Sequence, residues 1–143
     1  MKCSIERGVT RIDKVFREFE AFNKDGKSIG MADVSVLRTD KKFLWIHELQ
    51  VQPECRNKGV GTEIIGAIVD HAKELKADLI YTFPMTPTDE PNPIDQKKIE
   101  HFYKKNGFVS CNAPEDVATV TDEGLKKRGL CLKLTKADWT LVK

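Results

Sequence analysis

A predicted strand that leads into a basic, glycine-punctuated turn constrains this chain most. Residues 43–51 are rich in the apolar and aromatic side chains typical of a strand, and the turn that follows spans residues 56–61. Beyond the turn, apolar residues recur at helical spacing, at Ile64, Ile65, Ile68, Ala72 and Leu75. The pattern therefore predicts a strand, a tight turn and a helix in immediate succession.

A turn in this position is suited to bind an anion. The first backbone N–H groups of a helix lack intrahelical acceptors, and the helix dipole places partial positive charge beside them. Arg56 and Lys58 add full positive charges, and Gly59 and Gly61 allow the backbone to approach a ligand closely. The sequence therefore predicts a site for a phosphate-bearing ligand at residues 56–61.

Two familiar glycine-loop signatures are excluded by the residues themselves. A Walker A loop ends in Gly-Lys-Ser/Thr, whereas Thr62 follows Gly61 directly. A dinucleotide fingerprint requires a third glycine at position 64, which is Ile64. The signature that fits residues 56–61 is Arg/Gln-x-x-Gly-x-Gly/Ala.

Together with a second motif downstream, this signature resembles the GNAT superfamily of acyl-CoA-dependent N-acyltransferases. The second motif, residues 102–108, matches a Phe/Leu-Tyr-x-x-x-Gly-Phe helix end, where Gly107 is placed to terminate the helix and Phe108 to fold back onto it. Residues 48–51 resemble the family's fourth strand. The resemblance covers about residues 15–112 and implies that the basic turn binds the pyrophosphate of coenzyme A, with acetyl-CoA as co-substrate.

The resemblance also implies a set of coenzyme contacts. Backbone groups of the fourth strand are expected to pair with the pantetheine arm, and the turn is expected to hold the pyrophosphate. Gln96 stands where many members carry an asparagine near the coenzyme. The expected coenzyme-binding residues are Leu49, Gln50, Val51, Arg56, Asn57, Lys58, Gly59, Val60, Gly61, Thr62 and Gln96.

Three residues are candidates for the chemistry. The resemblance implies that Tyr103 is the general acid that protonates the departing thiolate. Its phenol is protonated at neutral pH, as a general acid must be. His47 and Glu48 compete as the general base. Alternation along a strand would place His47 on one face with Trp45 and Leu49, whereas a bulge in the family's fourth strand would turn Glu48 toward the substrate.

The expected fold class is α/β (mixed α+β): a GNAT fold with a central, mostly antiparallel sheet, splayed fourth and fifth strands, flanking helices and a shortened N-terminal helical region. Residues 1–6 are expected to form a first strand. Apolar residues between positions 12 and 22 also match an amphipathic helix, but the family order favours a strand at residues 15–22. Residues 1–143 are expected to form a single acyltransferase domain.

Composition excludes several function classes. The net charge of +2 gives no excess of the size that nucleic-acid binding needs, and no segment is apolar for long enough to span a membrane. The N-terminus lacks a secretory apolar region, so the expected location is cytoplasmic. The four cysteines form no metal-binding pattern and are expected to be reduced, and His71 and His101 are expected at the surface. No metal is expected.

The predicted function is transfer of an acetyl group from acetyl-CoA to a primary amine by direct attack in a ternary complex. The acceptor is a small molecule or a peptide, and the proline-rich loop at residues 84–93, with Asp89 and Glu90, is expected to border it. Three alternatives remain: acetylation of a protein N-terminus or lysine, a catalytically silent CoA-binding module, and an unrelated phosphate-binding domain. The shortened N-terminal region predicts either an open cleft or one completed by a second subunit in a homodimer.

Overall fold

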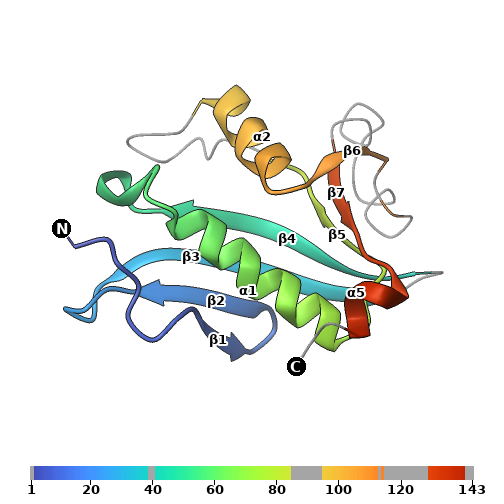
Figure 1. Ribbon diagram of the computed structural model, residues 1–143, viewed down its shortest axis with the longest axis horizontal. Coiled ribbons are helices and arrows are strands. Elements are labelled where there is room, and N and C mark those ends of the chain that lie inside the picture. The colour runs from blue at the N-terminus through green and yellow to red at the C-terminus, as the bar shows by residue number, and fades with distance from the viewer. Residues whose placement is uncertain (1, 39–40, 85–94, 113, 115–128, 141–143) are drawn as a thin grey trace.

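One mixed sheet organises the chain (Figure 1). The computed structural model describes residues 2–38, 41–84, 95–112, 114 and 129–140. Seven strands lie in the order β1-β2-β3-β4-β5-β7-β6, and only β4 and β5 pair in parallel. Their bounds are β1 (Thr10–Asp13), β2 (Arg17–Phe22), β3 (Ser28–Arg38), β4 (Lys42–Val51), β5 (Leu79–Thr82), β6 (Val109–Cys111) and β7 (Gly129–Lys133). The mixed, mostly antiparallel sheet confirms the expected fold class.

The helices follow the predicted order. A short 3-10 helix, η1 (Pro53–Cys55), leads from β4 toward α1 (Val60–Glu74), which lies across one face of the sheet (Figure 1). The parallel pairing of β4 and β5 requires a crossover, and α1 supplies it. The other helices are α2 (Gln96–Lys105) and α5 (Lys136–Thr140).

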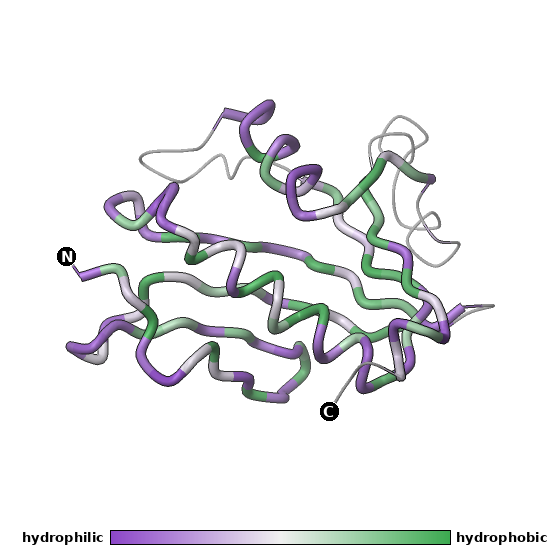
Figure 2. Tube along the Cα trace, viewed as in Figure 1, coloured by the Kyte–Doolittle hydropathy of each residue, from purple (hydrophilic) through white to green (hydrophobic). Residues whose placement is uncertain are grey.

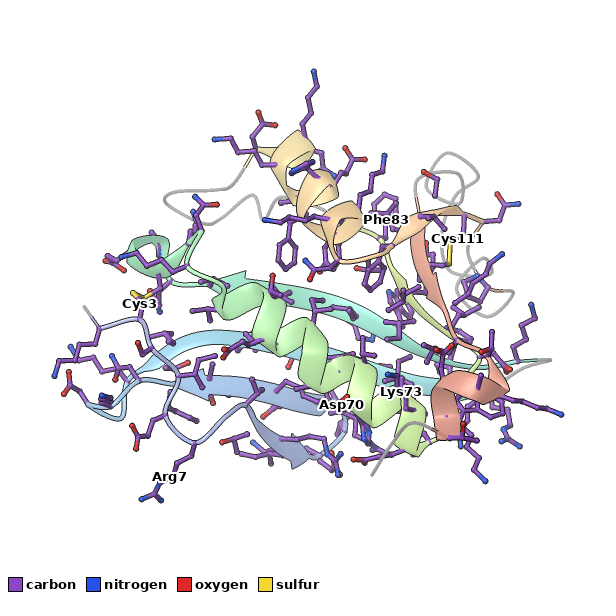
Figure 3. The ribbon with its side chains drawn as sticks, in the orientation of Figure 1. Cys3, Arg7, Asp70, Lys73, Phe83 and Cys111 are labelled. Carbon is purple, nitrogen blue, oxygen red and sulfur yellow. A yellow bond between two sulfur atoms is a disulfide. The ribbon has the colours of Figure 1, made fainter. Side chains whose placement is uncertain are left out.

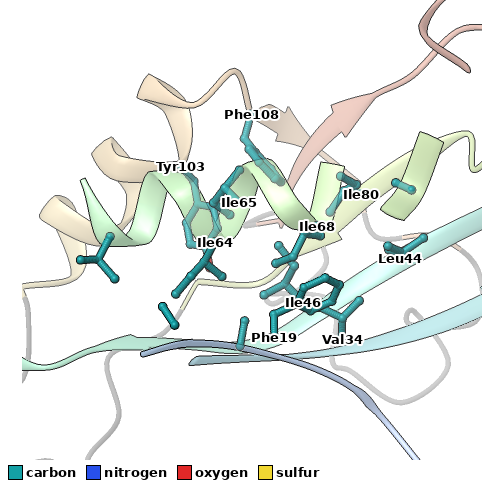
Figure 4. Close-up of a cluster of buried hydrophobic side chains, with 14 of the residues drawn as sticks. Phe19, Val34, Leu44, Ile46, Ile64, Ile65, Ile68, Ile80, Tyr103 and Phe108 are labelled. Carbon is teal, nitrogen blue, oxygen red and sulfur yellow. The ribbon is translucent and has the colours of Figure 1, made fainter. Parts of the chain in front are cut away.

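The main core lies between α1 and the sheet. Burial alternates along β2 and along residues 30–35 of β3, as expected when one face of a sheet is buried, whereas β5 is buried throughout; Figure 2 shows the hydropathy of each residue along these strands. Ile64 and Ile68 of α1 are fully buried in this core, while Tyr103 and Phe108 extend it toward α2 (Figure 4). A smaller cluster on the opposite face contains Phe43, Leu79, Tyr81 and Cys131, with Trp45 and Phe83 packed against it. The sheet therefore carries apolar side chains on both faces.

The N-terminal region is a hairpin. Burial alternates along β2, where Phe19 and Ala21 are buried and their neighbours are half-buried, so the strand prediction for this segment is confirmed. The expected first strand at residues 1–6 is wrong, because residues 2–6 form no strand and the first strand is β1, at Thr10–Asp13, which pairs with β2. Only residues 14–16 separate β1 from β2, so no helix separates the two strands.

The expectation of reduced cysteines is wrong. Cys3 is bonded to Cys55, and Cys111 is bonded to Cys131, so all four cysteines are paired. Figure 3 labels Cys3 near the N-terminus and Cys111 on β6. The paired cysteines are 52 and 20 residues apart in the sequence and come together only in the folded chain, so their spacing did not predict the bonds. Cys3–Cys55 ties the N-terminal segment to η1, immediately before the basic turn.

The surface expectation holds for His101 and is wrong for His71. His71 is 4% exposed, beneath Phe19, and its Nδ1 lies 2.6 Å from Arg11 Nη1. It is buried because Arg11 of β1 and Phe19 of β2 both contact its ring. Within the described part of the chain, no helix is long and apolar enough to cross a membrane.

Candidate active site

The basic turn joins η1 to α1 in an unusual backbone conformation. Asn57 has a φ of 64° and Gly59 a φ of 87°, so two left-handed residues flank Lys58. The side chain of Arg56 folds back, and its Nε donates a hydrogen bond of 3.2 Å to the carbonyl oxygen of Val51. Arg56 therefore stabilises the turn against the end of β4, while the side chain of Lys58 stays exposed to solvent.

The N-terminus of α1 is open to an anion. The helix begins at Val60, and Gly59 at the N-cap offers no side chain to bind the first N–H groups. Gly61 and Thr62 belong to that first turn, whose N–H groups have no acceptor within the helix. A phosphate is a suitable acceptor there, because the helix dipole favours negative charge at this end.

Gly61 also joins this turn to α2. A Cβ at position 61 would lie 2.9 Å from Cζ of Phe102, so the ring of Phe102 packs directly against the glycine. Phe102 adjoins Tyr103, and their ring centroids are 5.3 Å apart. The Phe102 ring therefore packs between the basic turn and Tyr103, the candidate general acid.

β4 and β5 separate halfway along β4. Their parallel pairing ends with Ile46 and Thr82, although β4 continues to Val51. The hydroxyl of Thr82 donates a hydrogen bond of 3.2 Å to the carbonyl oxygen of Ile46 and closes the paired region. Within the described residues, the edge of β4 beyond Ile46 has no strand beside it on the β5 side. In the described part of the chain, an extended ligand could therefore pair with β4 along this edge, up to the Val51 carbonyl oxygen that accepts from Arg56.

Tyr103 lies at the point where the strands separate. Its side chain shares a hydrogen bond with Thr82 and is 4% exposed. Burial raises the pKa of the Tyr103 phenol to about 12, more than the hydrogen bond with Thr82 lowers it. The ring also packs edge-on against Phe102 and Phe108. Tyr103 is therefore a protonated donor held in one position.

A β-bulge places the two candidate bases on one face. Glu48 pairs with Asp33 and Ile46 pairs with Val34, so His47 is the extra residue of β4. Directly opposed residues share a sheet face, which places Glu48 with Asp33 on the face opposite α1. His47 lies there too, because its ring contacts Trp45 and Ser35 of that face.

The bulge also corrects the predicted strand face. Alternation predicted that Leu49 would share a face with His47, but Leu49 pairs with Ala32 and packs against the core beneath α1. A bulge shifts the alternation by one residue, so every side chain after it changes face. Of the predicted coenzyme contacts, Leu49 and Val51 consequently face the core, whereas Gln50 faces the open side.

His47 is held by three neighbours. Its Nε2 lies 2.5 Å from Ser35 Oγ, and its ring centroid lies 4.2 Å from that of Trp45 and 5.1 Å from that of Phe16. Desolvation lowers the pKa of His47 below its usual value of 6.5, and the charge of Asp33 opposes that shift. The imidazole is therefore neutral at pH 7, the form that accepts a proton.

Glu48 belongs to a row of carboxylates. It accepts a hydrogen bond from Nε2 of Gln50, and it pairs with Asp33, which pairs in turn with Glu18. Desolvation and, next, the charge of Glu18 raise the pKa of Asp33. Like charges on directly opposed strand positions repel one another, so this row favours a positively charged neighbour. Lys14 supplies one at its outer end, 3.4 Å from Glu18.

Gln96 is the remaining predicted coenzyme contact. It opens α2, where the side chain of Asp95 caps the helix, and its Nε2 donates a hydrogen bond of 2.5 Å to the carbonyl oxygen of Pro84. It therefore ties α2 to the segment after β5. Residues 85–94, with Asp89 and Glu90, lie outside the described residues. Among the residues that are described, no group of three potential metal ligands occurs.

Sequence reasoning missed four residues of this site. Thr82 and Ser35 are small hydroxyl residues within strands, where neither spacing nor composition distinguishes them. Phe16 and Asp33 reach His47 only through the β1–β2 turn and the pairing of β3 with β4. A predicted strand register with a bulge at His47 would have identified Ser35 and Asp33, and no signal pointed to Phe16.

Known proteins provide an independent comparison. A family model described as an acetyltransferase (GNAT) domain matches residues 17–110. The solved structure of nourseothricin acetyltransferase is 23% identical, with a TM-score of 0.60 over 85% of this chain and 66% of that protein. A glucosamine N-acetyltransferase region of a fungal multi-domain β-N-acetylglucosaminidase is 28% identical, with a TM-score of 0.58 over 70% of this chain and 12% of that protein.

A third structure was solved with a ligand. The PaiA N-acetyltransferase of Thermoplasma acidophilum, in complex with coenzyme A, is 15% identical, with a TM-score of 0.59 over 82% of this chain and 60% of that protein. This chain thus spans less than two thirds of the length of the PaiA N-acetyltransferase and of nourseothricin acetyltransferase. No protein with a curated description matches the sequence.

Proposed function

Because this chain belongs to the GNAT acetyltransferase family, we propose that it transfers an acetyl group from acetyl-CoA to a primary amine. The amine attacks the thioester directly in a ternary complex, and no acyl-enzyme forms. The observation that supports this most is that the candidate acid and the candidate bases flank one gap in the sheet, the point beyond Ile46 and Thr82 where the pairing of β4 with β5 ends. Tyr103 lies beside Thr82 on the α1 side of the separating strands, while His47 and Glu48 lie on the other side.

The coenzyme would span this gap from the basic turn. Arg56 and Lys58 with the first N–H groups of α1 would hold the pyrophosphate, and the unpaired edge of β4 would pair with the pantetheine arm. The ring of Phe102 contacts both Gly61 in the basic turn and Tyr103, which supports a single continuous site. The coenzyme supplies the activated acetyl group.

The chain's own contribution is proton transfer and positioning. The attacking nitrogen forms a bond to the carbonyl carbon and loses a proton to His47 or Glu48, directly or through a water. As the carbon–sulfur bond breaks, Tyr103 donates its proton to the departing thiolate. Unpaired backbone N–H groups of β4 would stabilise the oxygen that gains charge.

A cationic acceptor fits the open face. The row formed by Glu18, Asp33 and Glu48 would attract an ammonium group before it loses its proton, and Trp45 and Phe16 offer aromatic faces beside it. This supports a small amine or a basic peptide. It does not separate the two, so acetylation of a protein N-terminus or lysine remains the second candidate.

The two disulfides bear on the cellular location. The cytoplasmic location stays a prediction from the sequence, and the disulfides Cys3–Cys55 and Cys111–Cys131 weigh against it, because such bonds persist mainly in oxidising compartments. A homodimer also stays a prediction.

A panel of amines incubated with acetyl-CoA tests the function and the acceptor class together. Release of free CoA thiol that depends on one class of amine supports the proposal. A protein that CoA stabilises thermally but that acetylates no small amine or peptide would instead be a silent CoA-binding module. Equal stabilisation by CoA and by free nucleotides would favour the unrelated phosphate-binding domain.

A further inference from the structure

We propose that Ser35 is a positioning residue for the base: its Oγ holds His47 by Nε2 and leaves Nδ1 as the atom that accepts the proton of the amine. The inference rests on the proposed function and deepens it, because it selects His47 over Glu48 and assigns the reacting nitrogen. Ser35 belongs to β3 and lies directly opposite Trp45.

Three side chains contact the His47 ring and fix its orientation. A bulged residue has no directly opposed partner on the next strand, so only side-chain contacts orient it. His47 is exposed, and the rings of Trp45 and Phe16 contact its ring at interplanar angles of 42° and 59°, while Ser35 binds one nitrogen. Among the described residues, no hydrogen bond involves Nδ1.

The chemistry of imidazole explains why this contact matters. A neutral imidazole carries its proton on one nitrogen and accepts at the other. If Ser35 Oγ accepts from Nε2–H, then Nδ1 has a free lone pair. When His47 takes a proton from the amine, Nε2–H still donates to Ser35, so the hydroxyl also stabilises the charged product.

Glu48 is less suited to the role. Its carboxylate already accepts a hydrogen bond from Gln50 and faces the negative charge of Asp33. His47 gains from the same surroundings, because Asp33 stabilises its imidazolium. The charged and titratable groups facing this site among the described residues are Asp33 from β3, Glu18 with Lys14 from β2 and its preceding turn, Glu48 from β4 itself, and Tyr81 from β5 behind Trp45.

The first experiment reads the ring directly. Long-range ¹H–¹⁵N NMR of the whole protein reports which nitrogen of each imidazole carries the proton, and the spectrum of His47→Gln assigns the resonance. We expect the proton on Nε2 in the unaltered protein. Ser35→Ala should give a mixture of both tautomers, and Ser35→Thr, which keeps a hydroxyl and suits a strand, should restore the single form.

The second experiment uses the pH dependence of kcat/KM with the best amine of the panel. Loss of the hydroxyl should lower kcat/KM about five- to tenfold at neutral pH, the range of one hydrogen bond. It should also move the acidic limb to lower pH, because the imidazolium loses an acceptor. Ser35→Thr should recover most of the rate, and Ser110→Ala, at an exposed position of β6, should leave both rate and profile unchanged.

The outcomes separate this inference from the proposed function. A proton on Nδ1 in the unaltered protein, or a Ser35→Ala variant with unchanged tautomer and pH profile, overturns the role of Ser35 even if amines are acetylated. A gain of one acetyl mass on Ser35 with acetyl-CoA alone would make it a nucleophile and also overturn it. If no amine is acetylated, the proposed function fails, whatever the NMR spectrum shows.

Discussion

Tyr103 of α2 and Thr82 at the end of β5 share a hydrogen bond where β4 and β5 stop pairing. Thr82 also binds the backbone of Ile46, the residue before His47. Two short links therefore connect the candidate acid on one side of the sheet to the candidate base on the other.

Replacing Tyr103 by Phe should lower kcat by about 100-fold, the lower end of the range for a general acid, while CoA affinity stays within about twofold. The ring still packs between Phe102 and Phe108, so the fold should persist. Thiol-release kinetics and a CoA titration measure the two effects. Tyr81→Phe removes the chain's other phenol and should keep full activity; equal losses in both variants would mean that Tyr103 is only a packing residue.

Alanine substitutions at Gly61 and Gly66, both in α1, should have opposite effects, because only Gly61 packs against Phe102. Gly61→Ala places a methyl group 2.9 Å from the Phe102 ring, so we expect loss of about 1 kcal/mol of stability and weaker CoA binding. Gly66→Ala meets no atom within 4 Å and should stabilise the helix by about 1 kcal/mol with unchanged CoA binding. Denaturant unfolding and CoA titration of both variants measure this. Equal shifts in the two proteins would argue against the contact.

The two disulfides predict a strong dependence on reductant. By loop-closure entropy, Cys3–Cys55 contributes about 4 kcal/mol and Cys111–Cys131 about 3 kcal/mol. Reduction should therefore lower the melting temperature, and the Cys3→Ser/Cys55→Ser protein should lose more stability than the Cys111→Ser/Cys131→Ser protein. Intact mass after alkylation without reductant tests the premise. Four alkylated thiols in protein kept free of reductant would contradict it.

The part-buried contact between Arg11 and the buried His71 predicts a loss of stability in acid. Arginine only donates, so Nδ1 of His71 must accept, and a proton there would break the contact and set two positive charges together. Desolvation and, next, the charge of Arg11 lower the pKa of His71 below 6.5. Because the unfolded state then binds the proton more tightly, this stability is complete above pH 6.5 and is lost as pH falls through the folded-state pKa.

Chemical unfolding between pH 5 and 8 measures this effect. His71→Gln should flatten the pH dependence in part, since the pKa of His47 is also lowered and contributes in the same direction. His101→Gln, at an exposed position of α2, should keep the original slope. A slope that His71→Gln leaves unchanged would remove His71 as its source.

The sequence was most informative where a local motif requires one backbone shape. The turn at residues 56–61, the helix that follows it and the left-handed Gly107 after α2 were predicted from short-range rules, and the structure contains all three. The disulfides, the burial of His71 and the contact of Ser35 with His47 depend on strand pairing over long sequence distances. To predict the face on which Leu49 lies, one must know that β4 has its bulge at His47, and the pattern of residues does not reveal that position.

A crystal structure with bound CoA tests the central claim, that one gap between β4 and β5 holds the thioester between acid and base. We predict the pyrophosphate at residues 56–61, on the first N–H groups of α1, and the sulfur within about 3.5 Å of the Tyr103 hydroxyl, a hydrogen bond to sulfur being longer than one to oxygen. The pantetheine arm should pair with β4 beyond Ile46. A pyrophosphate bound elsewhere, or a sulfur remote from Tyr103, would contradict the account.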